Sequence, residues 1–148
     1  MTGDESLAEW ASHGWLRAQA PDAAVVAQLL GIVRRELLDS EASGLSVDSA
    51  FTHLYQAGLT LGTLALHVAG YRVRRGESQH ERTIESLGHT LGPGADGERG
   101  LLRVARKRRH LLEYELTGAV SRADAEALRQ GVLRLEDQTA SFLKERGF

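Results

Sequence analysis

The residues best suited to chemistry lie between positions 103 and 114, where arginine, lysine and histidine alternate with apolar residues. Residues three, four and seven apart share one face of a helix. Arg103, Arg106 and His110 therefore form one polar stripe. Arginine can neutralise a phosphate group, and histidine can transfer a proton near neutral pH. This combination suits RNA cleavage without a metal ion, in which histidine moves protons and guanidinium groups stabilise the phosphorane.

Arg109 occupies an unusual position on the same predicted helix. It falls on the line of Leu102, Ala105 and Leu112, which the spacing predicts to be the buried face. An arginine on a buried face must extend to the rim, pair with a carboxylate, or face a groove or a partner. We therefore regard Arg109 as a candidate groove residue, and an arginine packed at the rim of the helix contact is the alternative.

The charge of the chain is unevenly distributed. The stretch 71–110 contains ten basic and five acidic residues and carries +5, although the whole chain has a net charge of −2. Such asymmetry predicts an anionic partner, with nucleic acid as the leading candidate, and a merely solvated basic face is the alternative. The candidate phosphate-binding residues in this stretch are Arg72, Arg75, Arg103, Arg106 and Lys107.

Patterns typical of metal centres and redox sites are missing from the sequence. The chain has no cysteine, which excludes disulfides, Cys-ligated zinc and thiol catalysis. It also lacks an HExxH motif, an EF-hand calcium loop and a Walker loop, and we interpret the glycine-rich run at 92–97 as a connecting loop rather than a phosphate-binding loop. We therefore predict no metal site and no cofactor. We interpret His53 and His67 as packing or rim residues of a long helix.

Helical periodicity extends through almost the whole chain. The segment from about 46 to 69 is apolar nearly all round, so it should be the central helix. No alternating segment bounded by turns predicts a strand. We expect an all-α, up-and-down antiparallel bundle of four main helices plus one or two short helices. The predicted helices span about 6–18, 22–43, 46–69, 79–91, 98–116 and 121–145.

Length and composition indicate one domain over residues 1–148, with residues 1–20 as a short helical extension. Apolar residues make up 42% of the chain and charged residues 26%, as in ordinary globular proteins. No apolar run approaches the ~18 residues that span a bilayer, and the acidic N-terminus does not resemble a signal peptide. We expect a cytoplasmic protein without membrane association.

Three stretches, taken together in order, resemble the HEPN superfamily of small helical bundles. They are residues 51–59 with 65–72, residues 80–87, and residues 106–115, which a final helix capped by Ser121 follows. The resemblance covers about Asp22 to Phe148 and implies a HEPN-like bundle that forms a homodimer. Many members of the superfamily resemble metal-independent ribonucleases, often toxins paired with an antitoxin protein. Others act as binding or dimerisation modules.

The superfamily's motif is an arginine followed, after four to six residues, by a histidine, often with a polar residue directly after the arginine. Placed on Arg109, the motif has His110 in the polar position and Tyr114 in the histidine position. Placed on Arg103, it reaches His110. The resemblance therefore implies Arg109, His110 and Tyr114 as catalytic candidates. Tyrosine titrates near pH ~10, so Tyr114 would be a weak base at neutral pH.

Two functions remain open at this point. The first is a HEPN-like protein that binds RNA or a nucleotide through a basic groove, in one version as a metal-independent ribonuclease toxin with an antitoxin partner. The alternative is a non-catalytic helical dimerisation or interaction module with a basic partner-binding surface. RNA turnover distinguishes the two, because only the first function requires it.

Overall fold

The computed structural model describes residues 6–114 and 119–148, and for Glu113 and Tyr114 it describes the backbone alone. Most of these residues lie in helices, which confirms the predicted mostly helical fold. The predicted helix end at Leu116 lies outside the described residues. The elements are α1 (Leu7–Ser12), β1 (Leu16–Ala18), α2 (Ala23–Asp39), α3 (Val47–Val68), β2 (Tyr71–Val73), α4 (Gln79–Thr90), the 3₁₀ turn η1 (Pro93–Ala95), α5 (Asp96–Tyr114) and α6 (Arg122–Glu145).

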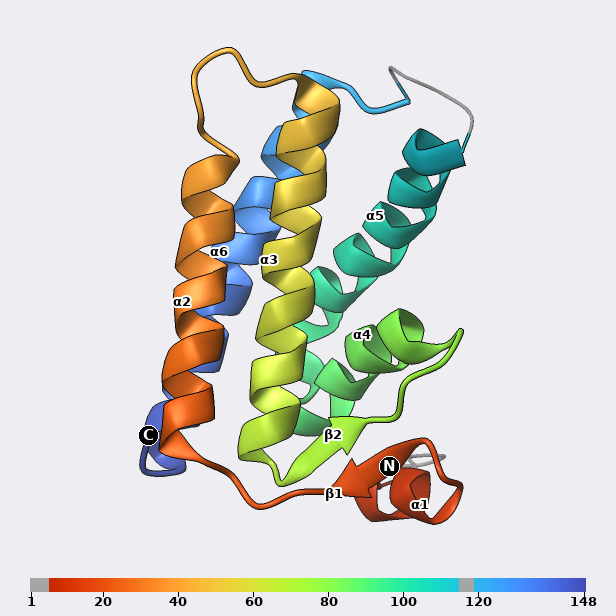
Figure 1. Cartoon of the computed structure of the whole chain (residues 1–148), viewed down its shortest axis with the longest axis vertical. Coiled ribbons are helices and arrows are strands. Elements are labelled where there is room, and N and C mark those ends of the chain that lie inside the picture. The colour runs from red at the N-terminus through yellow and green to blue at the C-terminus, as the bar shows by residue number, and fades with distance from the viewer. Residues whose placement is uncertain (1–5, 115–118) are drawn as a thin grey trace.

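The long helix α3 occupies the centre of the fold (Figure 1) and packs against α2, α4, α5 and α6. Its side chains Tyr55, Leu61 and Leu64 are fully buried, as the all-round apolar pattern predicts. Figure 1 shows α2 and α5 running in one direction along the molecule and α3 and α6 in the other. The shorter α4 lies beside α3 and α5.

Two glycines allow α3 to lie close to its neighbours. A Cβ atom at Gly58 would lie 2.5 Å from Cδ2 of Leu102 on α5. A Cβ atom at Gly62 would lie 3.1 Å from Cγ2 of Thr83 on α4. Neither approach leaves room for a larger residue without movement, because core atoms are already close-packed. The small residues of α3 thus let both α4 and α5 pack against one face of it.

The N-terminal region differs from the sequence prediction. The helix predicted over 6–18 ends at Ser12, and Leu16–Ala18 forms a strand paired antiparallel with Tyr71–Val73. The turn between helix and strand uses Gly14 at φ +81°, a conformation that glycine adopts without strain. Leu16 is then buried beside Trp10 and Leu66. The prediction of no strand is therefore wrong, because a three-residue strand is too short to show alternation.

Helix starts agree with the sequence prediction. Asp22 caps α2 through the Ala24 amide, and Ser121 and Asp124 form a reciprocal capping box at α6. The backbone N–H of Asp22 also donates to Nε2 of the buried His67 at 3.0 Å, which ties the start of α2 to the end of α3. Among the described residues, no helix is both long and apolar enough to cross a bilayer.

Candidate functional site

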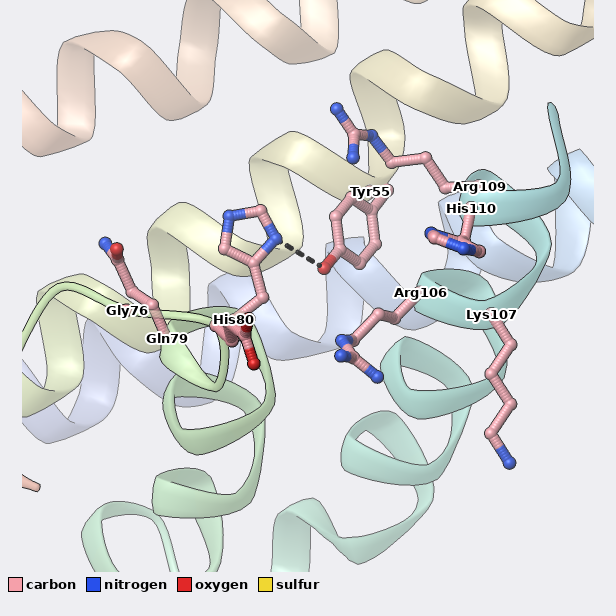
Figure 2. Close-up of a pocket in the computed structure, with 9 residues that line it drawn as sticks. Tyr55, Gly76, Gln79, His80, Arg106, Lys107, Arg109 and His110 are labelled. Carbon is pink, nitrogen blue, oxygen red and sulfur yellow. Dashed lines mark hydrogen bonds between the residues drawn. The ribbon is translucent and has the colours of Figure 1, made fainter. Parts of the chain in front are cut away.

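A pocket of about 520 Å³ opens between α3, α5 and the start of α4. Figure 2 shows that its side chains come from these three helices and from the connection that precedes α4. We call it the basic pocket, because arginine, lysine and histidine predominate in its lining. The lining residues are Tyr55, Gly76, Glu77, Gln79, His80, Arg106, Lys107, Arg109 and His110.

Tyr55 and His80 form the inner part of the basic pocket. The hydroxyl of Tyr55 lies 3.2 Å from Nδ1 of His80 and is hydrogen-bonded to it (Figure 2). Burial raises the pKa of Tyr55, although the positive charges of Arg109 and Arg106 act in the opposite direction. The Tyr55 hydroxyl therefore keeps its proton at neutral pH and remains a hydrogen-bonding group rather than a phenolate.

Sequence reasoning did not select Tyr55 or His80 as site residues. They lie 25 positions apart and on different helices, so no spacing rule connects them. Both fall within the stretches that carry the HEPN resemblance, which was the available signal. The close approach of α4 to α3 at Gly62 accounts for the contact, because it lets a residue of the first turn of α4 reach a core tyrosine.

Arg109 is half-buried, as its position on the apolar line of α5 predicts. Its Cζ atom lies 5.6 Å from the centroid of the Tyr55 ring, within the range of a cation–π contact. His110, the next residue, is exposed at the pocket. The structure therefore brings these two predicted catalytic candidates to one pocket. The third, Tyr114, ends α5, and its side chain lies outside the described part.

Arg106 and Lys107 supply further positive charge to the basic pocket. Arg106 is half-buried and Lys107 is exposed. No carboxylate with a described side chain forms an ion pair with either of them. In Figure 2 the Arg106 side chain extends into the space below the Tyr55 ring, whereas Lys107 extends away from Tyr55. Both predicted phosphate-binding residues are thus placed where an anion could reach them.

Arg103, also predicted to bind phosphate, is engaged elsewhere. Its Nε and Nη2 atoms donate to the two carboxylate oxygens of Glu85, each at 2.8 Å. This hydrogen bonding, together with the positive charges of Arg103 and Arg99, holds the pKa of Glu85 below its usual value, although burial opposes it. Arg103 does not line the basic pocket. The fold therefore uses Arg103 to join α5 to α4.

The other two phosphate-binding candidates, Arg72 and Arg75, line a different pocket. This second pocket lies between α2, α3, β2 and α4 and has a volume of about 260 Å³. Both arginines are exposed there. The five predicted phosphate-binding residues are thus divided between the basic pocket, the second pocket and an ion pair.

One group of described residues has the spacing for a metal ion, and it lies outside both pockets. The ligand atoms of Glu36, Asp39 and His53 are all within 4.8 Å of one another. Nδ1 of His53 lies 3.0 Å from Oε1 of Glu36. This hydrogen bond joins α2 to α3 and explains why His53 is half-buried, as the interpretation of a packing residue expects.

Comparisons with protein-family models, with curated proteins and with solved structures found nothing that matches this chain. The basic pocket itself is therefore the basis for inferring the function. That pocket combines positive charge for binding an anion with two imidazoles that can transfer protons, and the buried Tyr55 hydroxyl fixes the position of one imidazole.

Proposed function

We propose that this chain is a HEPN-like protein that binds RNA or a nucleotide by its phosphate groups in the basic pocket. The observation that carries the proposal is the convergence of Arg106, Lys107 and Arg109 on one pocket that also contains His80 and His110. Of these cations, Arg106 and Lys107 form no ion pair within the described side chains. A phosphate that binds Arg106 and Lys107 would gain charge-assisted hydrogen bonds without first breaking an ion pair of these two side chains.

The same residues support metal-independent RNA cleavage as the catalytic form of the proposal. An imidazole acting as base would take the proton of the 2′-hydroxyl, which then attacks the phosphorus atom. Guanidinium groups would stabilise the charge on the phosphorane, and an imidazolium would protonate the departing 5′-oxygen. His110 is exposed at the pocket for such a role, and His80 is held by Tyr55.

The test is incubation of the purified protein with labelled RNA, with and without EDTA. We expect cleavage that persists in EDTA and is abolished by His110→Ala and by Arg109→Ala. Arg106→Ala should weaken RNA binding about 10-fold or more, since a hydrogen bond to a charged group contributes about 1.5–3 kcal/mol.

Arg34→Ala is the matched control, because Arg34 is an exposed arginine of α2 that lines neither pocket. Circular dichroism would establish that each variant is folded. If Arg106→Ala and Arg34→Ala weaken RNA binding equally, the result contradicts the proposal. Binding through Arg106 without turnover would retain the binding function and reject the ribonuclease form.

A non-catalytic dimerisation module is the second candidate, and one feature of α5 favours it. Val104 and Leu111 lie seven residues apart on one face of α5 and are 51% and 40% exposed. Burial of both in a homodimer would remove apolar surface from water. We expect Val104→Asp combined with Leu111→Asp to convert a dimer to a monomer in sedimentation velocity. A wild-type chain that sediments as a monomer at high concentration would exclude this candidate.

A further inference from the structure

The second pocket directly adjoins the basic pocket. Gln79 lines both, and the consecutive residues Arg75 and Gly76 line one pocket each. Because consecutive Cα atoms are only ~3.8 Å apart, the boundary between the pockets is a single stretch of backbone. Figure 2 shows Gly76 and Gln79 beside His80, at the edge of the basic pocket. A ligand that crosses this stretch of backbone would contact both pockets.

The lining of the second pocket is divided between apolar and cationic groups. Val25 and Leu29 of α2, together with Leu66 of α3, provide an apolar wall. Arg72 and Arg75 line the same pocket and are exposed. Within the described residues neither arginine is held by an ion pair. A pocket with one apolar wall and exposed guanidinium groups fits a ligand that has both an apolar and an anionic part.

A nucleotide has this division. Its base has two apolar faces and a polar edge, and its phosphate is an anion. The hydroxyl of Thr63 and the side-chain amide of Gln79, which also line the second pocket, can pair with the polar edge of a base. The volume of about 260 Å³ is small, so the second pocket would take one base rather than a base pair.

We infer that the ligand of this protein is a single-stranded oligonucleotide that occupies both pockets. One phosphate lies in the basic pocket, the base of an adjacent nucleotide lies in the second pocket, and Arg72 and Arg75 contact the phosphate of that nucleotide. The inference rests on the proposed function and adds the substrate class. A base can enter a pocket of this size only when it is unpaired, so single strands bind and duplexes do not.

The first test measures binding by fluorescence anisotropy, with 2′-O-methyl oligoribonucleotides that cannot be cleaved through the 2′-hydroxyl. The probes are adenosine monophosphate, a labelled hexamer, the same hexamer as a duplex, and a hexamer without bases. We expect the single-stranded hexamer to bind at least 10-fold more tightly than each of the other three. Equal affinity for the hexamer and the monophosphate, or for the hexamers with and without bases, would overturn the inference.

The second test compares two pairs of substitutions that remove the same charge. Arg72→Ala with Arg75→Ala should weaken hexamer binding at least 10-fold and leave monophosphate binding within about twofold. The slope of log affinity against log salt should fall by about 0.7 for each phosphate that the double variant no longer neutralises. Arg34→Ala with Arg35→Ala is the control, because both residues are exposed on α2 and line neither pocket. Equally weakened hexamer binding in the two double variants would overturn the inference.

The two tests also separate this inference from the proposed function. If no probe binds, or if Arg106→Ala changes the binding of none, the basic pocket is not a phosphate site and both proposals fail. If monophosphate binding depends on Arg106 but the hexamer binds no more tightly, only the second pocket is rejected. Thr63→Phe gives an independent readout, since a ring in the second pocket should abolish the preference for a hexamer with bases over one without.

Discussion

Tyr55 contacts both sides of the basic pocket through different parts of its side chain. Its hydroxyl bonds to Nδ1 of His80 on α4, and its ring lies 5.6 Å from Cζ of Arg109 on α5. Because burial raises the pKa of Tyr55, the hydroxyl stays neutral. At the scale of residues, one core tyrosine therefore sets the positions of an imidazole and a guanidinium group.

Substitution Tyr55→Phe tests this role. We expect a loss of about 1 kcal/mol in the free energy of unfolding, because a buried hydrogen bond is removed while the ring is retained. The imidazole resonances of His80 should also shift in NMR spectra. Tyr71→Phe is the control, since Tyr71 is half-buried and its hydroxyl has no hydrogen bond among the described residues. Unchanged His80 resonances in Tyr55→Phe would contradict the role.

At the scale of elements, the basic pocket depends on how closely α4 and α5 pack against α3. Gly62 permits the approach of α4, and Gly58 permits the approach of α5. The bidentate contact between Arg103 and Glu85 then joins α5 to α4. Because all three helices contact one another, a displacement of any one of them would change the pocket.

Gly62→Val should therefore destabilise the fold. A Cβ atom there would lie 3.1 Å from Cγ2 and 3.3 Å from the backbone oxygen of Thr83, and the backbone oxygen cannot move without shifting α4. Overpacking of this kind costs about 1–3 kcal/mol, which urea unfolding would measure. Gly31→Val is the matched control on α2, because a Cβ atom at Gly31 meets no atom within 4 Å. Equal stabilities of the two variants would argue against close packing at Gly62.

At the scale of the whole molecule, ion pairs neutralise part of the basic segment and leave another part accessible. Glu85 pairs with Arg103 and Arg99, and Asp124 pairs with Arg108. Arg72, Arg75, Arg106 and Lys107 line the two pockets instead. The +5 charge of residues 71–110 is thus sorted by the fold into a structural set and a set that can meet a ligand.

These ion pairs make stability depend on pH in acid. The hydrogen bond from Arg103 lowers the pKa of Glu85 in the folded chain, so its stabilisation is present above the ordinary glutamate pKa and is lost as the pH falls through the lowered value. Glu85→Gln should lower the free energy of unfolding by about 0.5–1 kcal/mol at pH 7, a modest amount because the ion pair is partly exposed. The loss should be smaller below pH ~4. Urea unfolding at pH 7 and at pH ~3.5 would measure both. If Glu85→Gln lowers the free energy of unfolding equally at the two pH values, the ion pair does not stabilise the fold as proposed.

Apart from the strand at Leu16–Ala18, the sequence by itself determined which segments are mainly helical, where most helices begin and which helix is buried. These features follow from local periodicity and from caps such as Asp22 and Ser121, so neighbouring residues specify them. The half-burial of Arg109 was also predictable, because it follows from the face of one helix. The HEPN resemblance and the function drawn from it stay predictions.

Only the tertiary structure decided which polar residues meet. It paired Arg103 with Glu85, placed His80 on Tyr55, and formed the small β-ladder between Leu16–Ala18 and Tyr71–Val73. Each of these contacts joins residues at least 18 positions apart. Local spacing carries no information about such contacts, since they arise from the packing of whole helices against one another, and the two pockets form where that packing leaves space.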